Sequence, residues 1–106
     1  PGRSPSAGHH RTGNGAAHMI AELVKELKAC PQARVSITGH TDDTVADAAG
    51  IELSARQAKA VADAFIRQGV SADRVTSSGA GATEPIAGND TEAGRAQNRR
   101  VEITVS

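Results

Sequence analysis

Apolar residues recur at helical spacing in two stretches of the chain. In residues 16–28, four aliphatic side chains occupy positions i, i+3, i+4 and i+7, which form one stripe along a helix. They are Ile20, Leu23, Val24 and Leu27. A second stripe follows Leu53 and consists of Ala58, Val61, Ala62, Phe65 and Ile66. We therefore expect two amphipathic helices that each bury one face, and we expect Pro31 to stop the first.

Local signals predict where the second helix begins and ends. Ser54 with Gln57 three residues later has the spacing of a capping box, so we expect this helix to begin after Leu53. Gly69 has the place of the residue just past the helix end, with Val70 positioned for a Schellman-type contact. On this interpretation the first turn of the helix contains Arg56.

Alternation of apolar and polar residues predicts three strands, over residues 34–39, 74–78 and 100–105, of which the second is short and weak. A strand–helix–strand unit over residues 35–78 should be a right-handed crossover with parallel strands, and the last strand should run antiparallel to a neighbour. We expect residues 79–94 to be a loop, followed by a short helical turn capped by Thr91. The predicted fold class is α+β, with a small mixed sheet packed against two main helices.

The first fifteen residues differ from the rest in composition. They contain four Gly, two Pro, two Ser and no large aliphatic residue, so we expect a disordered tail or a cloning remnant, and a domain over residues 16–106. The chain begins with Pro1 rather than Met, and we expect a fragment or a processed product. His9, His10 and His18 lack a scaffold for a metal site, and we expect no metal and no cofactor.

Composition excludes several classes of function. The 106 residues suffice for one small domain, and 12 Lys plus Arg balance 12 Asp plus Glu. A neutral chain without Trp or Tyr is poorly suited to bind nucleic acid, which requires basic faces and stacking platforms. Since 20 of the hydrophobic residues are Ala, the core should be thin. No run is long enough to insert into a membrane, and Cys30 has no partner for an internal disulfide.

Two charged side chains stand out as candidates for ligand binding. Asp42 lies just beyond the C-terminal end of a predicted strand, the edge where α/β sheets bind ligands. Arg56 falls in the expected first turn of the next helix, where the helix dipole disfavours a cation. The two side chains could bind an anion and a cation, they could form a salt bridge with each other, or Asp42 could serve only as an Asx-turn residue.

An enzymatic interpretation has little support in this sequence. His40 and Asp42 suggest His–Asp catalysis, but no nucleophile elbow, HExxH, Walker A or CxxC motif accompanies them. The Gly79-x-Gly81 pair is a weak hint of a phosphate loop, and a Gly-rich turn is the default interpretation. Because these catalytic motifs are absent, we expect a protein that is not an enzyme.

Strand alternation over residues 100–105 predicts that the side chain of Arg100 faces outward.

Several separated motifs resemble one family, the OmpA-like C-terminal domain shared with Pal and MotB proteins. The resemblance extends from about residue 20 to the end of the chain. The matching segments are Ile37-Thr-Gly-His-Thr-Asp42, Leu53-Ser-Ala-Arg-Gln-Ala58, Gly69-Val70, Arg74-Val75, Gly79-Ala-Gly81, Pro85-Ile86, Asn89 and Thr91-x-x-Gly-Arg-x-x-Asn-Arg-Arg-Val-Glu-Ile103.

The resemblance implies a module that binds peptidoglycan without catalysis. In the family, the Asp of the His-Thr-Asp motif contacts the ammonium of meso-diaminopimelate, and the Arg of a Leu-Ser-x-x-Arg motif contacts a carboxylate of the same residue. The resemblance assigns these roles to Asp42 and Arg56, and it places Arg99 near the ligand. The resemblance also implies secondary pocket positions at Thr41, Thr44, Leu53 and Asn98.

The sequence departs from the family pattern in several places. Gly50 stands where the family usually has Asn, so one side-chain hydrogen bond should be missing. Asp43 and Val45 replace the usual Asn and Gly after the aspartate, and Asp43 adds negative charge. Residues 1–15 lack the usual first strand, so we expect a three-stranded sheet. Cys30 could pair with a cysteine in a longer chain.

Three hypotheses follow from the sequence. The first is a cell-wall binding module that anchors an envelope protein to peptidoglycan through its diaminopimelate stem peptide. The parent protein would be membrane-anchored, with the domain on the periplasmic or cell-wall-facing side. The second is a structural or partner-binding domain of the same fold with a degenerate pocket. The third is a small enzyme that uses His40 and Asp42.

Overall fold

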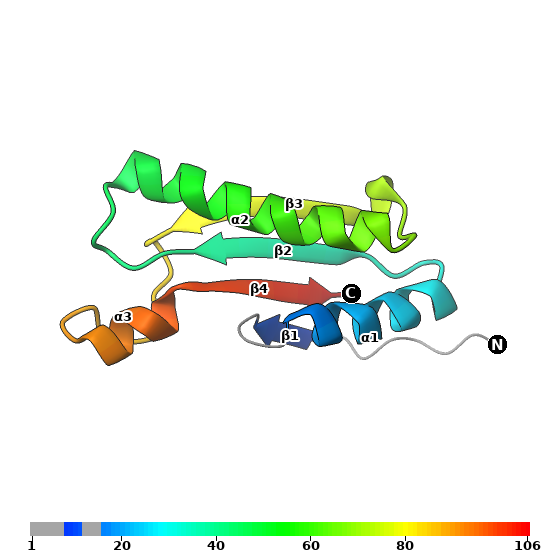
Figure 1. The fold of residues 1–106 in the computed structure, drawn as a ribbon, viewed down its shortest axis with the longest axis horizontal. Coiled ribbons are helices and arrows are strands. Elements are labelled where there is room, and N and C mark those ends of the chain that lie inside the picture. Colours follow the sequence, from blue (N-terminus) through cyan, green and yellow to red (C-terminus); the bar gives the residue numbers. More distant parts are fainter. Residues whose placement is uncertain (1–7, 12–15) are drawn as a thin grey trace.

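The computed structural model describes residues 8–11 and 16–106, with side chains from His18 onward. The helices and strands follow one another along an elongated molecule (Figure 1). They are β1 (Gly8–Arg11), α1 (Ala16–Ala29), β2 (Val35–His40), α2 (Asp47–Arg67), a 3₁₀ turn (Ala72–Arg74), β3 (Val75–Gly81), α3 (Glu92–Asn98) and β4 (Arg100–Val105).

The described strands form one sheet in the order β1-β4-β2-β3. β2 pairs with β3 in parallel, and β4 runs antiparallel to β2, as the sequence predicts. The fold class α+β, with a mixed sheet and two main helices, is therefore confirmed. β3 extends to Gly81, so the glycine-rich segment that we expected to be a loop begins as a strand.

The expected absence of a first strand is wrong. Residues 8–11 form β1, which pairs antiparallel with β4 from Gly8↔Val105 to Arg11↔Glu102 and gives the sheet a fourth strand. The segment Gly-His-His-Arg has no apolar alternation, so nothing in its pattern indicates a strand. It is added through backbone hydrogen bonds to the free edge of β4, which depend little on side-chain type. The remainder of the expected tail, residues 1–7 and 12–15, lies outside the described residues.

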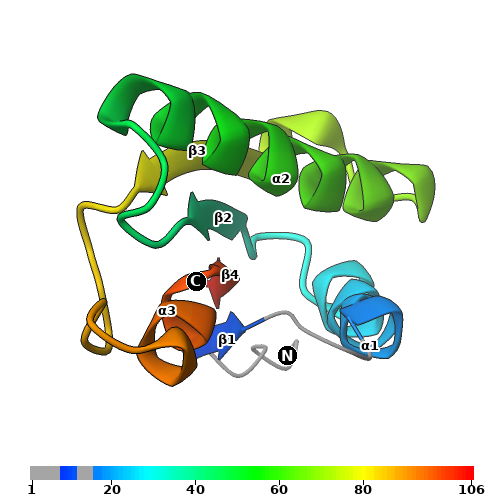
Figure 2. The same cartoon turned by 60° about the vertical axis from the view of Figure 1, so that its left-hand side comes forward.

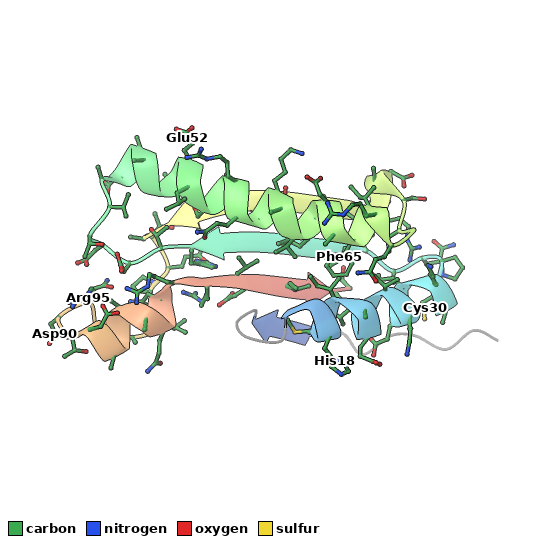
Figure 3. All side chains as sticks on the ribbon, viewed as in Figure 1. His18, Cys30, Glu52, Phe65, Asp90 and Arg95 are labelled. Carbon is green, nitrogen blue, oxygen red and sulfur yellow. The ribbon has the colours of Figure 1, made fainter. Side chains whose placement is uncertain are left out.

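The core lies between the sheet and the two long helices, which cover the same face (Figure 2). Phe65 is the largest fully buried side chain and points from α2 into this layer (Figure 3). The predicted apolar stripe of α1 is confirmed, and the alternating Val101, Ile103 and Val105 of β4 are buried. In the predicted stripe of α2, Ile66 is exposed. The buried hydrophobic residues are Ile20, Leu23, Val24, Leu27, Ala33, Val35, Ile37, Ala58, Ala62, Phe65, Val70, Val101, Ile103 and Val105.

The predicted start of the second helix is wrong. α2 begins at Asp47, seven residues before Ser54, and Ala46 at its N-cap makes no side-chain capping bond. Ser54 is instead fully buried inside the helix, where its hydroxyl donates to the carbonyl of Ile51 and accepts the N–H of Gly81, each at 3.0 Å. The capping-box spacing at Ser54 therefore does not mark the start of a helix, and the serine instead links α2 to β3 through its hydrogen bond with Gly81.

Glycines in two strands permit this close contact with α2. A Cβ atom at Gly39 would lie 2.1 Å from the carbonyl oxygen of Ser54, and one at Gly79 would lie 2.4 Å from the carbonyl oxygen of Ile51. Only a residue without a side chain fits there, so the backbone of α2 approaches both strands directly. The Gly79-x-Gly81 pair therefore has a packing role in this structure.

The ends of both long helices are closed by hydrogen bonds. Gly69 has a φ of 104°, its N–H donates to Ile66, and the N–H of buried Val70 donates to Phe65, which confirms the predicted Schellman motif. Arg74 closes the end of α1, because its Nη2 donates to the carbonyls of Leu27 and Cys30 at 2.7 and 2.8 Å. None of the helices in the described part of the chain is long and apolar enough to cross a membrane.

Candidate functional site

The C-terminal end of β2 meets the junction of α3 and β4. The antiparallel pairing of these strands places His40 opposite Arg100. Asp42 follows His40 by two residues, and Arg99 precedes Arg100 directly. Strand register therefore brings together two side chains that are 57 residues apart in the chain.

Asp42 is held as an ionised carboxylate. Its side chain is only 4% exposed, and its Oδ2 accepts a hydrogen bond from Nη1 of Arg99 at 2.7 Å. Its Oδ1 accepts from the backbone N–H of Thr44 at 3.0 Å and from the Thr44 hydroxyl, so Asp42 forms the Asx turn that was one of the alternatives left open by the sequence. The hydrogen bonds from Thr44 and then Arg99 lower the pKa of Asp42 from 3.8 to about 2. Asp42 therefore carries a negative charge at neutral pH.

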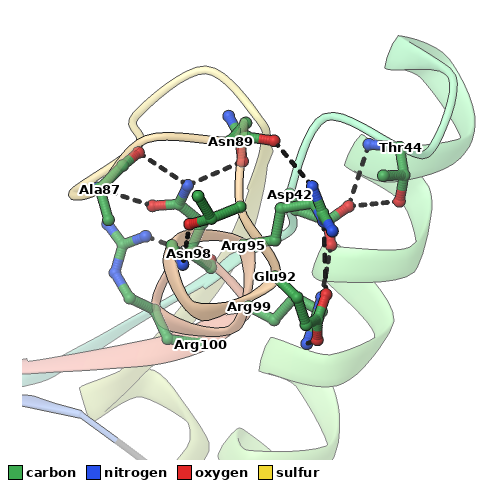
Figure 4. Close-up of polar contacts among 11 residues, drawn as sticks. Asp42, Thr44, Ala87, Asn89, Glu92, Arg95, Asn98, Arg99 and Arg100 are labelled. Atoms are coloured by element: carbon green, nitrogen blue, oxygen red, sulfur yellow. Dashed lines mark hydrogen bonds and ion pairs between the residues drawn. The ribbon is translucent and has the colours of Figure 1, made fainter.

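Arg99 joins Asp42 to a second carboxylate, that of Glu92 (Figure 4). Its Nη2 donates to Oε2 of Glu92 at 2.5 Å, and its side chain is 45% exposed. The hydrogen bonds raise the pKa of Arg99 and lower that of Glu92, so all three groups stay charged. Glu92 also approaches Nε of Arg95 at 3.3 Å. The family resemblance places Arg99 near a ligand, and no pattern in the sequence indicates Glu92.

Asn98 is fully buried beside this cluster, and its side-chain amide holds the loop that follows β3 in place through hydrogen bonds. Its Oδ1 accepts the N–H groups of Ile86 and Ala87 at 2.7 and 3.0 Å. Its Nδ2 donates to the carbonyl of Ala87 and to the side chain of Asn89 (Figure 4). All four hydrogen-bonding positions of the amide are used inside the protein, so its observed role is structural.

Arg56 lies away from Asp42, which corrects the geometric argument made from the sequence. It is the tenth residue of α2 rather than part of its first turn, and its side chain is exposed. Two residues after buried Ser54, it lies about 200° further around the helix, on the face opposite the sheet. Its side chain makes no hydrogen bond or ion pair with the described residues.

The motif spacing also assigns a different residue. In a Leu-Ser-x-x-Arg pattern the arginine follows the leucine by four positions, and counting from Leu53 leads to Gln57. Gln57 is exposed and lies on the side of α2 that half-buried Leu53 also occupies. At the position that the motif assigns to a cation, this chain therefore has a neutral amide.

Thr41 carries a buried hydroxyl without a hydrogen-bond partner among the described residues. A Cβ atom at Gly50 would lie 3.2 Å from this hydroxyl. The unpaired hydroxyl thus faces the position where the family resemblance leads one to expect an asparagine. Thr44 is exposed and holds Asp42.

His40 and Asp42 do not act on each other in this structure. The His40 ring is buried, its Nε2 lies 3.8 Å from Glu102, and burial followed by the charge of Arg100 lowers its pKa. Asp42 is bound by other residues, as described above. The expectation that the chain is not an enzyme stays a prediction. Across the part of the chain that the structure describes, no three His, Cys, Asp or Glu residues gather as metal ligands.

The prediction that Arg100 faces outward is wrong. The residue is only 7% exposed, because the loop after β3 covers it. Its Nη2 donates to the carbonyl of Glu84 at 2.9 Å, and its Nε donates to Glu102 at 2.6 Å. Strand alternation does not show that the loop after β3 folds over this face of the sheet and buries Arg100.

Comparisons with known proteins agree with this architecture. A model of the OmpA family matches residues 12–99, so the chain belongs to the OmpA family. The peptidoglycan-binding protein ArfA of Mycobacterium tuberculosis is 48% identical over 88 residues, which are 83% of this chain and 27% of that protein. The probable lipoprotein YiaD of Escherichia coli is 43% identical over 90 residues, which are 85% of this chain and 41% of that protein.

Solved structures show the same fold. The peptidoglycan-associated lipoprotein of Burkholderia pseudomallei superposes with a TM-score of 0.84 at 26% identity, covering 90% of this chain and 80% of that one. The C-terminal domain of Helicobacter pylori MotB gives 0.77 at 33% identity, covering 89% and 74%. The chain spans between a quarter and about two fifths of the length of the curated relatives ArfA and YiaD.

Proposed function

We propose that this domain binds peptidoglycan non-covalently through the diaminopimelate of the stem peptide and so anchors a longer envelope protein to the cell wall. Family membership supports the coarse function, since one relative is named a peptidoglycan-binding protein and another a peptidoglycan-associated lipoprotein. The cell envelope, on its periplasmic or wall-facing side, is the location that this function requires. A membrane anchor in the parent protein belongs to the same proposal.

The observation that carries the proposal is the buried carboxylate of Asp42 paired with the partly exposed guanidinium of Arg99. Diaminopimelate presents an ammonium and a carboxylate on one carbon at its free end, and it needs an anion and a cation a few ångströms apart. Asp42 and Arg99 are such a pair, at 2.7 Å. In the free domain Arg99 covers Asp42, so the ligand's ammonium takes its place and Arg99 turns to the ligand's carboxylate.

Arg56 has no part in the proposed pair, because its side chain lies on the outer face of α2. This difference provides a matched comparison of two exposed arginines. We expect Asp42→Asn and Arg99→Gln to lose most binding to purified sacculi in a pull-down, while Arg56→Gln keeps it. Loss of binding in Arg56→Gln with retention in Arg99→Gln would contradict the assignment.

The ligand class is tested separately by calorimetry with two stem peptides. A diaminopimelate stem offers both charges, whereas a lysine stem offers the ammonium alone. We expect the diaminopimelate stem to bind more tightly, because only its carboxylate engages Arg99. Equal affinity for both stems would leave peptidoglycan binding intact and reject the diaminopimelate assignment.

A second candidate function is a structural or partner-binding domain with a degenerate pocket. Three departures from the family pattern favour this alternative. The position of the motif's arginine is Gln57, Gly50 lies beside the unpaired Thr41 hydroxyl, and Val45 stands in the loop between β2 and α2. On this alternative the folded wild-type domain would show no binding to diaminopimelate-type sacculi at any accessible concentration.

A further inference from the structure

Glu92 holds Arg99 from the solvent side of the ion-paired cluster. Its Oε2 accepts from Nη2 at 2.5 Å, and its Oε1 lies 3.4 Å from Nη1. The Glu92 side chain is 66% exposed, whereas that of Asp42 on the other side of the same guanidinium is 4% exposed. One arginine is therefore shared between a buried carboxylate and an exposed one (Figure 4).

The exposed carboxylate occupies the place that a ligand's carboxylate needs. A guanidinium binds carboxylates through paired N–H groups on one edge, and Glu92 already uses the outer edge of Arg99. An incoming carboxylate either displaces Glu92 from that edge or lies next to its negative charge. Both arrangements make Glu92 oppose the ligand.

Glu92 has a second cationic partner besides Arg99. Its Oε1 lies 3.3 Å from Nε of Arg95, one turn along α3. Arg95 is fixed in turn by a hydrogen bond from its Nη1 to the carbonyl of Asn89 at 3.0 Å. When Arg99 turns to a ligand, Glu92 can keep Arg95 as its partner, so its release leaves no carboxylate unpaired.

We infer that Glu92 is an internal competitor for the ligand's carboxylate and sets how tightly the site binds the anionic end of a stem peptide. The inference rests on the proposed function, in which Arg99 receives that carboxylate. A different role for Glu92, holding Arg99 in the correct place, predicts the opposite sign, because removal of the carboxylate would then weaken binding.

The test is Glu92→Gln, measured by calorimetry with the diaminopimelate stem peptide. Exposed ion pairs contribute little, so we expect binding to tighten by about 2- to 5-fold. Glu52→Gln is the matched control, since Glu52 is an exposed acid on the outer side of α2 that makes no ion pair with the described residues (Figure 3). It removes the same charge outside the ion-paired cluster and should leave affinity unchanged.

A lysine stem separates competition from general electrostatics. This peptide lacks the carboxylate, so Glu92→Gln should not improve its binding. Weaker or unchanged binding of the diaminopimelate stem by Glu92→Gln, or an equal gain in Glu52→Gln or with the lysine stem, would overturn the inference while wild-type binding still supports the proposed function. Failure of the wild-type domain to bind sacculi would overturn both. Circular dichroism of each variant verifies that it is folded.

Discussion

At the end of the sheet where α1 packs, the buried contacts are apolar, and at the end where α3 packs they are polar. Leu27 and Phe65 are fully buried at the first end, beside the paired Val35 and Val105. At the second end, Asn98 is fully buried, and its amide makes four hydrogen bonds. Figure 1 shows α1 and α3 at opposite ends of the molecule.

The two ends contribute differently: the apolar end stabilises the fold, and the polar end holds the residues of the candidate site. Apolar burial is non-directional and tolerates small shifts, so the α1 end can supply most of the folding free energy without exact geometry. Charged and amide groups require defined partners, and when desolvated without them they cost free energy. The α3 end therefore holds Asp42 and Arg99 in a defined arrangement, on a scaffold that the other end stabilises.

The largest expected effect is at the apolar end. Phe65→Ala should cost about 3–5 kcal/mol of unfolding free energy, because it empties the centre of a core otherwise made of aliphatic side chains. Urea unfolding followed by far-UV circular dichroism measures it, since the chain has no Trp. Ile66→Ala, at the exposed neighbouring position, should cost much less. Equal losses at both positions would contradict the assigned face of α2.

Asn98→Ala tests the polar end and should cost about 2–3 kcal/mol. The change removes a buried amide and leaves the N–H groups of Ile86 and Ala87 without their partner. Gln97→Ala, one residue earlier on α3 and exposed, is the control and should be nearly neutral. A neutral Asn98→Ala would show that the loop after β3 does not depend on this amide.

Arg74→Ala should cost about 1.5 kcal/mol, because it removes charge-assisted hydrogen bonds to the last carbonyls of α1. The loss should appear as faster amide hydrogen exchange at the C-terminal end of α1 as well as in the unfolding midpoint. Arg67→Ala removes an exposed arginine of α2 and serves as the comparison. Unchanged exchange in α1 would argue against this capping role.

The last comparison concerns the pH dependence of the polar end. The folded-state pKa of Asp42, about 2, lies below the ordinary value of 3.8 that we assume for the unfolded chain. Its contribution to stability is therefore complete above about pH 4 and is lost as the pH falls toward 2. Thermal unfolding across this window should show a steeper decline for the wild type than for Asp42→Asn. Parallel curves would mean that Arg99 and Thr44 do not lower this pKa.

Local pattern was sufficient for most of the elements. The stripe of Ile20, Leu23, Val24 and Leu27 predicts α1, and the alternation over 100–105 predicts β4, since burial on one face leaves a periodic record in the chain. The Schellman motif at Gly69 and the Thr91 cap, which accepts from Gly94, are also local and were predicted correctly. Asp42 was identified because it lies just beyond the C-terminal end of a strand.

Contacts between distant segments determined the rest. β1 exists because β4 offers a free edge, and Ser54 is buried in α2 because glycines let β2 and β3 approach that helix. Arg99 rather than Arg56 meets Asp42 because antiparallel pairing of β2 and β4 brings the start of β4 to the end of β2. Arg56 and Arg99 are both exposed arginines. Which of them reaches the carboxylate depends on helix start and strand register, which are set by packing between segments far apart in the chain.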